Sequence, residues 1–214
     1  MALNSKEKIV VYGLLGANAA VFAAWQDNDR KRQQFMYTHF TMSCDSVRRM
    51  RRYHTMLTST FSHQSFNHFL FNMIALYSFG EPLLVRLGPL RFLTLYGIGG
   101  IASSACQLMI YDKIPYNWPS NRDYSWYSRS LGASGANNAI IAYSILFSPT
   151  STMFIYFVPV PAALAGLGII SIDFYGLYYG GTGIGHGAHL GGALFGTAFF
   201  LLSRRFPPPS TFRR

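Results

Sequence analysis

Long apolar runs separated by short charged stretches are the feature that most constrains this 214-residue chain. Charged residues make up 12% of the sequence, about half of the share in a soluble domain, whereas hydrophobic residues make up 50%. A run of about 20 apolar residues is typical of a helix that crosses a bilayer. Six such runs are predicted, at residues 9–25, 61–79, 90–110, 131–147, 152–172 and 186–203. The sequence therefore predicts an all-α polytopic membrane protein, a single domain over residues 1–214 with a bundle of six transmembrane helices.

The basic residues, which give a net charge of +10, lie in the connections between the apolar runs. A nucleic-acid-binding protein would instead carry them on one face of a soluble domain, so no nucleic-acid partner is predicted. Anionic lipid headgroups are the simpler partner for such connections. Residues 26–58 interleave arginines with aromatic residues, which favours a connection that lies on the membrane surface, and residues 204–214 form a basic Pro-rich tail.

The sequence shows neither a recognisable targeting segment in its first residues nor a cysteine-based site. Residues 1–8 show neither an Arg-rich amphipathic leader nor a small-residue cleavage site, so no transit or signal peptide is predicted there. Cys44 and Cys106 lack the spacing of a metal site or of a disulfide framework. No metal and no cofactor are predicted.

A serine stands among small residues where the fourth apolar run begins, in the stretch Gly132-Ala133-Ser134-Gly135. Small residues let a neighbouring helix approach the backbone closely, and the hydroxyl could bond to a carbonyl one turn earlier. Alternatively, Ser134 is a nucleophile at the start of a helix, near backbone N–H groups that could receive an oxyanion. The stretch alone favours the first interpretation and leaves the second open.

Histidines in two other runs change this balance. In the sixth run, His189, Gly192 and Gly196 share one helix face at spacings of three and four residues, which places an imidazole above a groove of two glycines. That groove can press against the small residues around the serine and bring the two side chains together. In the second run, His68 and Asn72 lie one turn apart, and polar residues inside a span usually face the bundle interior for a functional reason.

With these residues in this order, the chain resembles the rhomboid intramembrane serine proteases, and most of all the mitochondrial presenilin-associated rhomboid-like branch of that family. The resemblance implies a rhomboid-like six-helix bundle in which Ser134 is the nucleophile and His189 its general base. It also implies that His68 and Asn72, together with the backbone N–H of Ser134, receive the oxyanion.

The resemblance extends to residues around these four. His63 and His186 match further histidines of the branch, and we expect them to bond to water or to loops rather than to react. The glycines expected to pack the fourth helix against the sixth are Gly132, Gly135, Gly192 and Gly196.

The activity implied by the resemblance is cleavage of the transmembrane segments of single-span membrane proteins, by a multi-pass enzyme of the mitochondrial inner membrane. Two other interpretations stay open. A non-catalytic relative would bind transmembrane helices and direct their turnover, although such relatives typically lack the serine or the histidine. A small transporter would use the intramembrane histidines for passage, but it would leave the Gly-Ala-Ser-Gly stretch without a role.

None of the six predicted spans contains an aspartate or glutamate in its interior. A triad carboxylate would place an ionised group within the bundle, at a cost of about 2.5–3.5 kcal/mol. The expected catalytic unit is therefore a Ser-His dyad. Asp173, at the end of the fifth run, is expected to cap the following loop or to face the headgroups. Pro159 and Pro161 are expected to loosen the fifth helix, and Pro82 to end the second.

Overall fold

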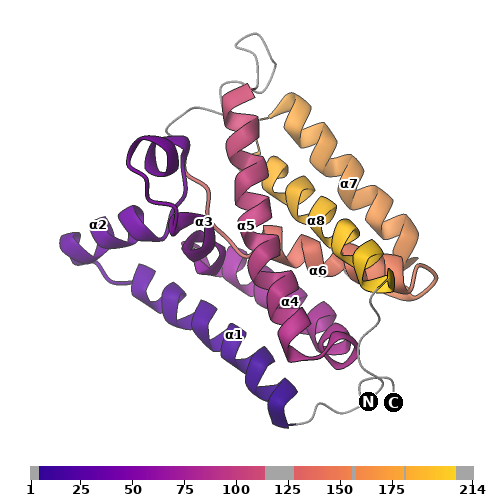
Figure 1. The fold of residues 1–214 in the computed structure, drawn as a ribbon. Coiled ribbons are helices and arrows are strands. Elements are labelled where there is room, and N and C mark those ends of the chain that lie inside the picture. The colour runs from indigo at the N-terminus through magenta and orange to yellow at the C-terminus, as the bar shows by residue number, and fades with distance from the viewer. Residues whose placement is uncertain (1–4, 114–127, 156–157, 181, 206–214) are drawn as a thin grey trace.

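The computed structural model describes residues 5–113, 128–155, 158–180 and 182–205. Most of these residues lie in helices, and the described chain begins and finishes at the same end of the bundle (Figure 1). The helices are α1 (Ser5–Trp25), α2 (Arg30–His39), α3 (Thr55–Thr58), α4 (Phe66–Leu87), α5 (Pro89–Lys113), α6 (Ser134–Phe147), α7 (Ala162–Tyr179) and α8 (His186–Arg205). The strands are β1 (Thr152–Ile155) and β2 (Val158–Pro161).

Several of these helices have the length and composition of membrane spans. Within the described residues, four are long and apolar enough to cross a membrane: Glu7–Trp25, Phe66–Leu87, Pro89–Asp112 and Ala162–Tyr179. The shorter α6, with 14 residues, lies centrally and packs against α4, α5, α7 and α8, and α8 packs in turn against α5 and α7. These helices confirm the prediction of an all-α polytopic membrane protein, with the β-hairpin as a small exception.

Apolar side chains fill the inside of the bundle and also cover its outside. Leu84, Phe92 and Ile140, from α4, α5 and α6, are each 0% exposed. On the outer surface, Leu90 and Leu194 are 79% and 70% exposed. An outer surface of this kind suits a hydrocarbon solvent, in which apolar side chains have no reason to be hidden.

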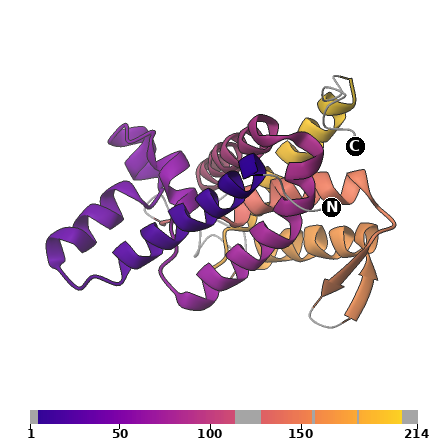
Figure 2. The same ribbon diagram turned by 90° about the horizontal axis from the view of Figure 1, so that it is seen from below.

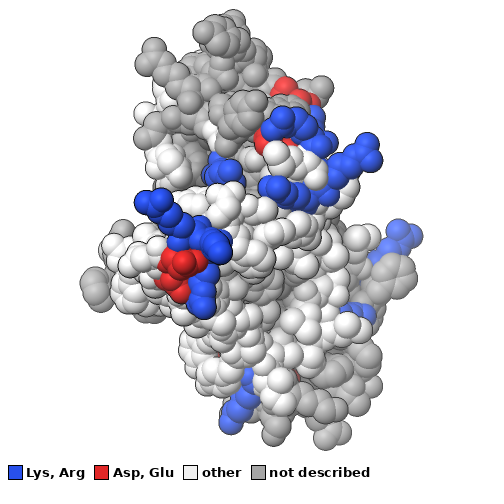
Figure 3. Space-filling model, turned by 90° about the vertical axis from the view of Figure 1, so that its left-hand side faces the viewer, with Lys and Arg blue, Asp and Glu red and all other residues white. Residues whose placement is uncertain are grey.

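The connection at residues 26–58 folds onto the bundle. It contains α2, a short π-helical turn (Asp45–Arg49) and α3, and it buries Met42, Cys44 and Val47 against Leu108 of α5. Figure 3 shows most of the Lys and Arg side chains of this face in the upper half of the view, a largely uncharged surface below them, and a few separate basic side chains at the right and at the bottom. This distribution agrees with a connection on the membrane surface, which stays a prediction; residues 206–214 of the predicted basic tail lie outside the described residues.

The second predicted span is displaced along the sequence, because α4 begins at Phe66 and not at residue 61. Ser65 caps the start of α4, where its hydroxyl accepts a hydrogen bond from the N–H of His68 at 3.3 Å. The expectation that Pro82 ends the helix is wrong, because the helix continues through it to Gly88, which caps the end with a φ of 77°. A proline inside a membrane helix removes one N–H bond, and neighbouring groups can offset that loss.

The fifth predicted span is also wrong in its first half. Strands β1 and β2 pair antiparallel, and this β-hairpin projects from the bundle (Figure 2). Pro159 and Pro161 lie in its second strand, where a free edge tolerates the missing N–H, so they precede a helix instead of loosening one. Helix α7 begins only at Ala162 and continues to Tyr179, beyond the predicted end at residue 172. Asp173 therefore lies inside the helix.

Candidate active site

Ser134 is the first residue of α6, and the loop before it is held by backbone hydrogen bonds. Ser130 and Met42 exchange two such bonds, of 2.8 and 2.9 Å. The N–H of Gly132 donates to the carbonyl oxygen of Ser59 at 2.9 Å, and its φ of 126° is one that glycine adopts readily. These bonds fix the position at which the helix, and with it the serine hydroxyl, begins.

His63 holds the same loop from the side of α4. It precedes that helix rather than lying within a span, it is 0% exposed, and its Nε2 accepts a hydrogen bond from the N–H of Ala133 at 3.2 Å. Burial, with a smaller contribution from the neighbouring His68, lowers the pKa of His63 to about 3. The ring is therefore neutral near pH 7, as an Nε2 that accepts a hydrogen bond requires.

His189, on the first turn of α8, faces the serine, and its Nε2 lies 2.9 Å from Ser134 Oγ. Helices α6 and α8 approach closely at this point because glycines line their contact. A Cβ on Gly192 would collide with the backbone of Gly135, and a Cβ on Gly196 would collide with the backbone of residue 139. The structure thus brings together the serine, the histidine and the glycine groove.

Gly192→Ala is expected to lower stability and activity together. The added methyl group must push α8 away from the backbone of α6, and overpacking of this kind typically costs about 1–3 kcal/mol. The same shift moves the imidazole off the serine, and a misplacement of about 1 Å can cost about 10²-fold in rate. Melting temperature in detergent and cleavage of a single-span reporter measure the two effects.

The matched control for this variant is Gly97→Ala in α5, because a Cβ at that position meets no atom within 4 Å apart from its chain neighbours and the adjacent backbone of its own helix. It should keep both its melting temperature and its activity. Equal behaviour of the two variants would show that the glycine contact does not hold the imidazole on the serine.

Asp173 lies directly behind the histidine. Its Oδ1 is 2.9 Å from His189 Nδ1, and its side chain is 7% exposed. The expectation that Asp173 caps a loop or faces headgroups is therefore wrong. The expectation that no carboxylate lies inside a span is wrong as well, because Asp173 lies within α7. The error follows from the hairpin, because a fifth helix placed over residues 152–172 leaves Asp173 at its end. Gly176, one turn further on, could have indicated that Asp173 faces the bundle, because a glycine on the same helix face marks a close approach of another element.

The same carboxylate oxygen binds a second imidazole. His186 Nδ1 lies 2.8 Å from Asp173 Oδ1, and its Nε2 lies 2.8 Å from Thr182 Oγ1. The ring packs against Gly176, where any side chain would collide with it. An ionised carboxylate only accepts hydrogen bonds, so Nδ1 carries the hydrogen in both rings. Nε2 of His189 is then free to accept the serine hydroxyl proton, which is what a general base requires.

The carboxylate and the two imidazoles also meet the distance criterion for a metal site. Their ligand atoms lie within 4.8 Å of one another, and no other group of three such side chains in the described part of the chain does so. The same atoms make the hydrogen bonds among Asp173, His186 and His189. A metal ion bound there would displace the bond that orients His189.

A cavity of about 520 Å³ opens beside the loop that precedes the serine. Its walls come from separate parts of the chain and include Tyr37, Gln64, His68, Leu131 and Thr182. The cavity lies where α7 ends and α8 begins, and its lining reaches Leu131, three residues before the serine.

His68 and Asn72 lie at different depths from this cavity. His68 lines the cavity, and its ring lies so close to Gly132 that a Cβ there would be 2.6 Å from Cε1. Asn72 is buried one turn further along α4, where its Nδ2 donates to the carbonyl of His68 at 2.8 Å and its Oδ1 accepts from Asn137 at 3.0 Å. The first N–H groups of α6 have no acceptor within the helix. A hydroxyl, a base and N–H donors of this kind together suit acyl transfer.

Comparison with known proteins shows clear similarity. Residues 50–206 match the Rhomboid domain. The chain is 38% identical to the mitochondrial RHOMBOID-like protein 12 of Arabidopsis thaliana, over 87% of this chain and 56% of that protein. It is 33% identical to the mitochondrial Rhomboid protein 1 of Saccharomyces cerevisiae, over 90% and 52%. It is 35% identical to the mitochondrial presenilin-associated rhomboid-like protein of Mus musculus, over 87% and 46%. The chain thus spans about half the length of these relatives.

Proposed function

Because the chain belongs to the rhomboid family, we propose that it is an intramembrane serine protease. Ser134 is the nucleophile, His189 is the general base, and Asp173 orients that base. The observation that carries the proposal is the 2.9 Å contact between Ser134 Oγ and His189 Nε2 at the start of a helix within a membrane bundle. The carboxylate of Asp173 makes the proposed unit a triad, where the sequence predicted a dyad.

The proposed reaction begins with attack of Ser134 Oγ on the carbonyl carbon of the scissile peptide bond, while its proton passes to His189 Nε2. Asp173 stabilises the imidazolium that forms. The N–H groups at the start of α6 receive the oxyanion with His68 and with the Asn72 N–H that is not bonded to the His68 carbonyl. Removing one such donor typically costs about 10²–10³ in turnover. His189 then protonates the leaving amine, and water from the cavity releases the acyl group from the serine.

The proposed substrates are transmembrane segments of single-span membrane proteins. Such a segment must become locally extended at the site, since a helix holds its carbonyl groups in hydrogen bonds. The mitochondrial names of the relatives support a location in mitochondria, and the inner membrane is the proposed membrane. Anionic headgroups are the proposed lipid partner of the basic connection at residues 26–58.

A non-catalytic relative that binds transmembrane helices and directs their turnover is the second candidate. It needs the bundle and a route for a helix, but no contact between a hydroxyl and an imidazole. The series from Ser134 through His189 to Asp173, with each step at 2.9 Å, supports the protease instead.

Covalent labelling of Ser134 by a fluorophosphonate in detergent tests the proposal. The full chain should form an adduct on Ser134, located by peptide mass spectrometry, because the nearby base makes this hydroxyl nucleophilic. His189→Asn should lose the adduct. Ser130→Ala is the matched control and should keep it, since Ser130 lines the cavity of the same loop. A chain that melts cooperatively but forms no adduct would contradict the protease and favour the helix-binding candidate.

A further inference from the structure

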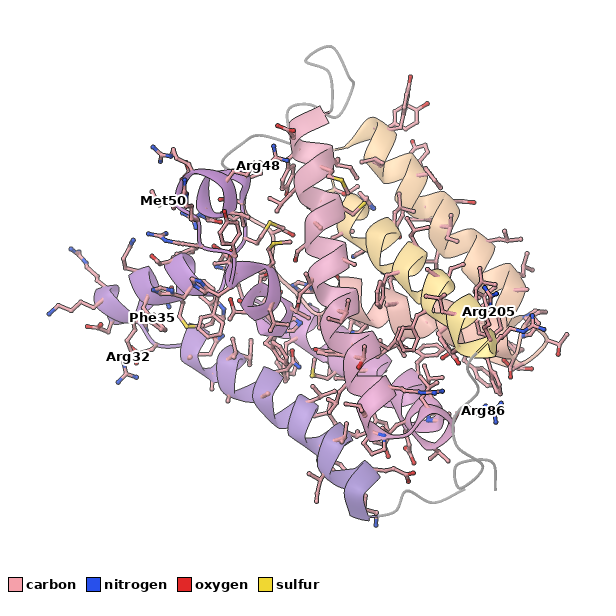
Figure 4. All side chains as sticks on the ribbon, in the orientation of Figure 1. Arg32, Phe35, Arg48, Met50, Arg86 and Arg205 are labelled. Atoms are coloured by element: carbon pink, nitrogen blue, oxygen red, sulfur yellow. The ribbon has the colours of Figure 1, made fainter. Side chains whose placement is uncertain are left out.

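A second cavity lies at the opposite end of α6 from Ser134. It has a volume of about 470 Å³ and is formed where α4, α6 and α8 end. Its lining includes Arg86, Leu146, Phe147, Phe200, Ser203 and Arg204. Figure 4 shows Arg86 and the neighbouring Arg205 at this end of the bundle, far from the basic connection that carries Arg48. None of these residues has a role in the proposed reaction.

The two arginines of this cavity lie on aromatic rings and not on carboxylates. Arg86 Cζ is 4.8 Å from the centre of the Phe147 ring, and Arg204 Cζ is 5.9 Å from the centre of the Phe200 ring. In the described part of the chain, neither arginine forms an ion pair with an acidic residue, and no acidic residue lines the cavity. A guanidinium that stacks on a ring keeps its N–H edge available for phosphate oxygens.

An apolar groove continues from the arginines. It has a volume of about 330 Å³, and it shares Arg86 and Phe147 with the 470 Å³ cavity. The groove lies between α4, the end of α6 and the β-hairpin, and its walls include Phe79, Leu83 and Ile145. A charged group held by the arginines would therefore have an apolar channel beside it.

We propose that the cavity and groove together bind one anionic phospholipid, with its phosphate at Arg86 and Arg204 and an acyl chain in the groove along α4. The charge is complementary, because each lining includes arginine and neither includes an acidic residue. The position also fits, since the ends of spanning helices lie at the depth of the headgroups. Free phosphate shares the headgroup chemistry, but it has no use for the groove.

Native mass spectrometry of the full chain tests this site, with phosphatidylglycerol and phosphatidylcholine offered in equal amounts. The chain should retain phosphatidylglycerol in preference. Arg86→Gln and Arg204→Gln should each weaken that retention about fivefold, the effect of one basic residue near an anionic surface. Arg205→Gln is the matched control and should retain the lipid, because Arg205 is exposed like Arg204 but does not line the cavity.

Two further measurements separate a lipid from an ion. Phosphatidylglycerol should raise the melting temperature, whereas the same concentration of inorganic phosphate should not. Ser78→Trp, which places a large side chain in the groove, should reduce lipid retention with both arginines intact. The proposal is overturned if Arg205→Gln loses as much lipid as Arg204→Gln, if both lipids are retained equally, or if inorganic phosphate stabilises the chain as much as the lipid does.

Discussion

Ser134→Ala is expected to abolish cleavage of a single-span membrane reporter, with a loss on the order of 10⁶, as when the nucleophile of a soluble serine protease is removed. The reason is that Ser134 carries the hydroxyl that His189 Nε2 contacts, at 2.9 Å. The fold should be unaffected, because alanine is tolerated at the start of a helix and fits wherever serine fits. Cleavage in proteoliposomes and the melting temperature together measure this result.

The control for this variant is Ser130→Ala, which removes a hydroxyl from the same loop and leaves the backbone bonds to Met42 in place. It should cleave at close to the rate of the unmodified chain. Substantial cleavage by Ser134→Ala would remove the protease proposal, whatever the control does.

Asp173→Asn is expected to have the next largest effect, a loss of roughly 10⁴-fold in turnover. An asparagine amide can donate a hydrogen bond to His189 Nδ1, which favours the ring tautomer with its hydrogen on Nε2. That tautomer cannot take the proton from Ser134. The shape of the side chain is unchanged, so the variant should still fold and melt cooperatively.

Asp112→Asn is the matched control, since Asp112 forms an ion pair with Arg48 at 2.8 Å, outside the site. It should keep its activity. If Asp173→Asn also keeps most of its activity, a Ser-His dyad is sufficient, and Asp173 serves only to link His186 and His189 to α7.

Features that follow a local pattern are the ones that the sequence predicts well. The apolar runs at residues 9–25 and 90–110 correspond to α1 and α5. The spacing of His189, Gly192 and Gly196 places all three on the face of α8 that meets α6. In each case the period of a helix decides which residues share a face, and no distant contact is needed to read it.

Features that depend on where an element begins are the ones that the sequence does not predict. Residues 152–161 are as apolar as the helix that follows, and only their pairing as two strands separates them from α7. For that reason Asp173, which the sequence predicts at the end of a span, lies inside α7 in the structure. Likewise, the cap at Ser65 decides that His63 precedes α4, and a hydropathy pattern does not contain that information.

The three side chains of the proposed triad belong to three different helices. Ser134 begins α6, His189 lies on α8, and Asp173 is carried by α7. Hydrogen bonds weaken beyond about 3.5 Å, so an outward tilt of α7 by about 1 Å at Asp173 would release the imidazole and leave its contact with the serine intact. A substrate that displaces α7 on its way in would therefore meet an enzyme that is temporarily switched off. Entry and bond cleavage by the proposed protease would then be successive events, because α7 would have to return before His189 is oriented again.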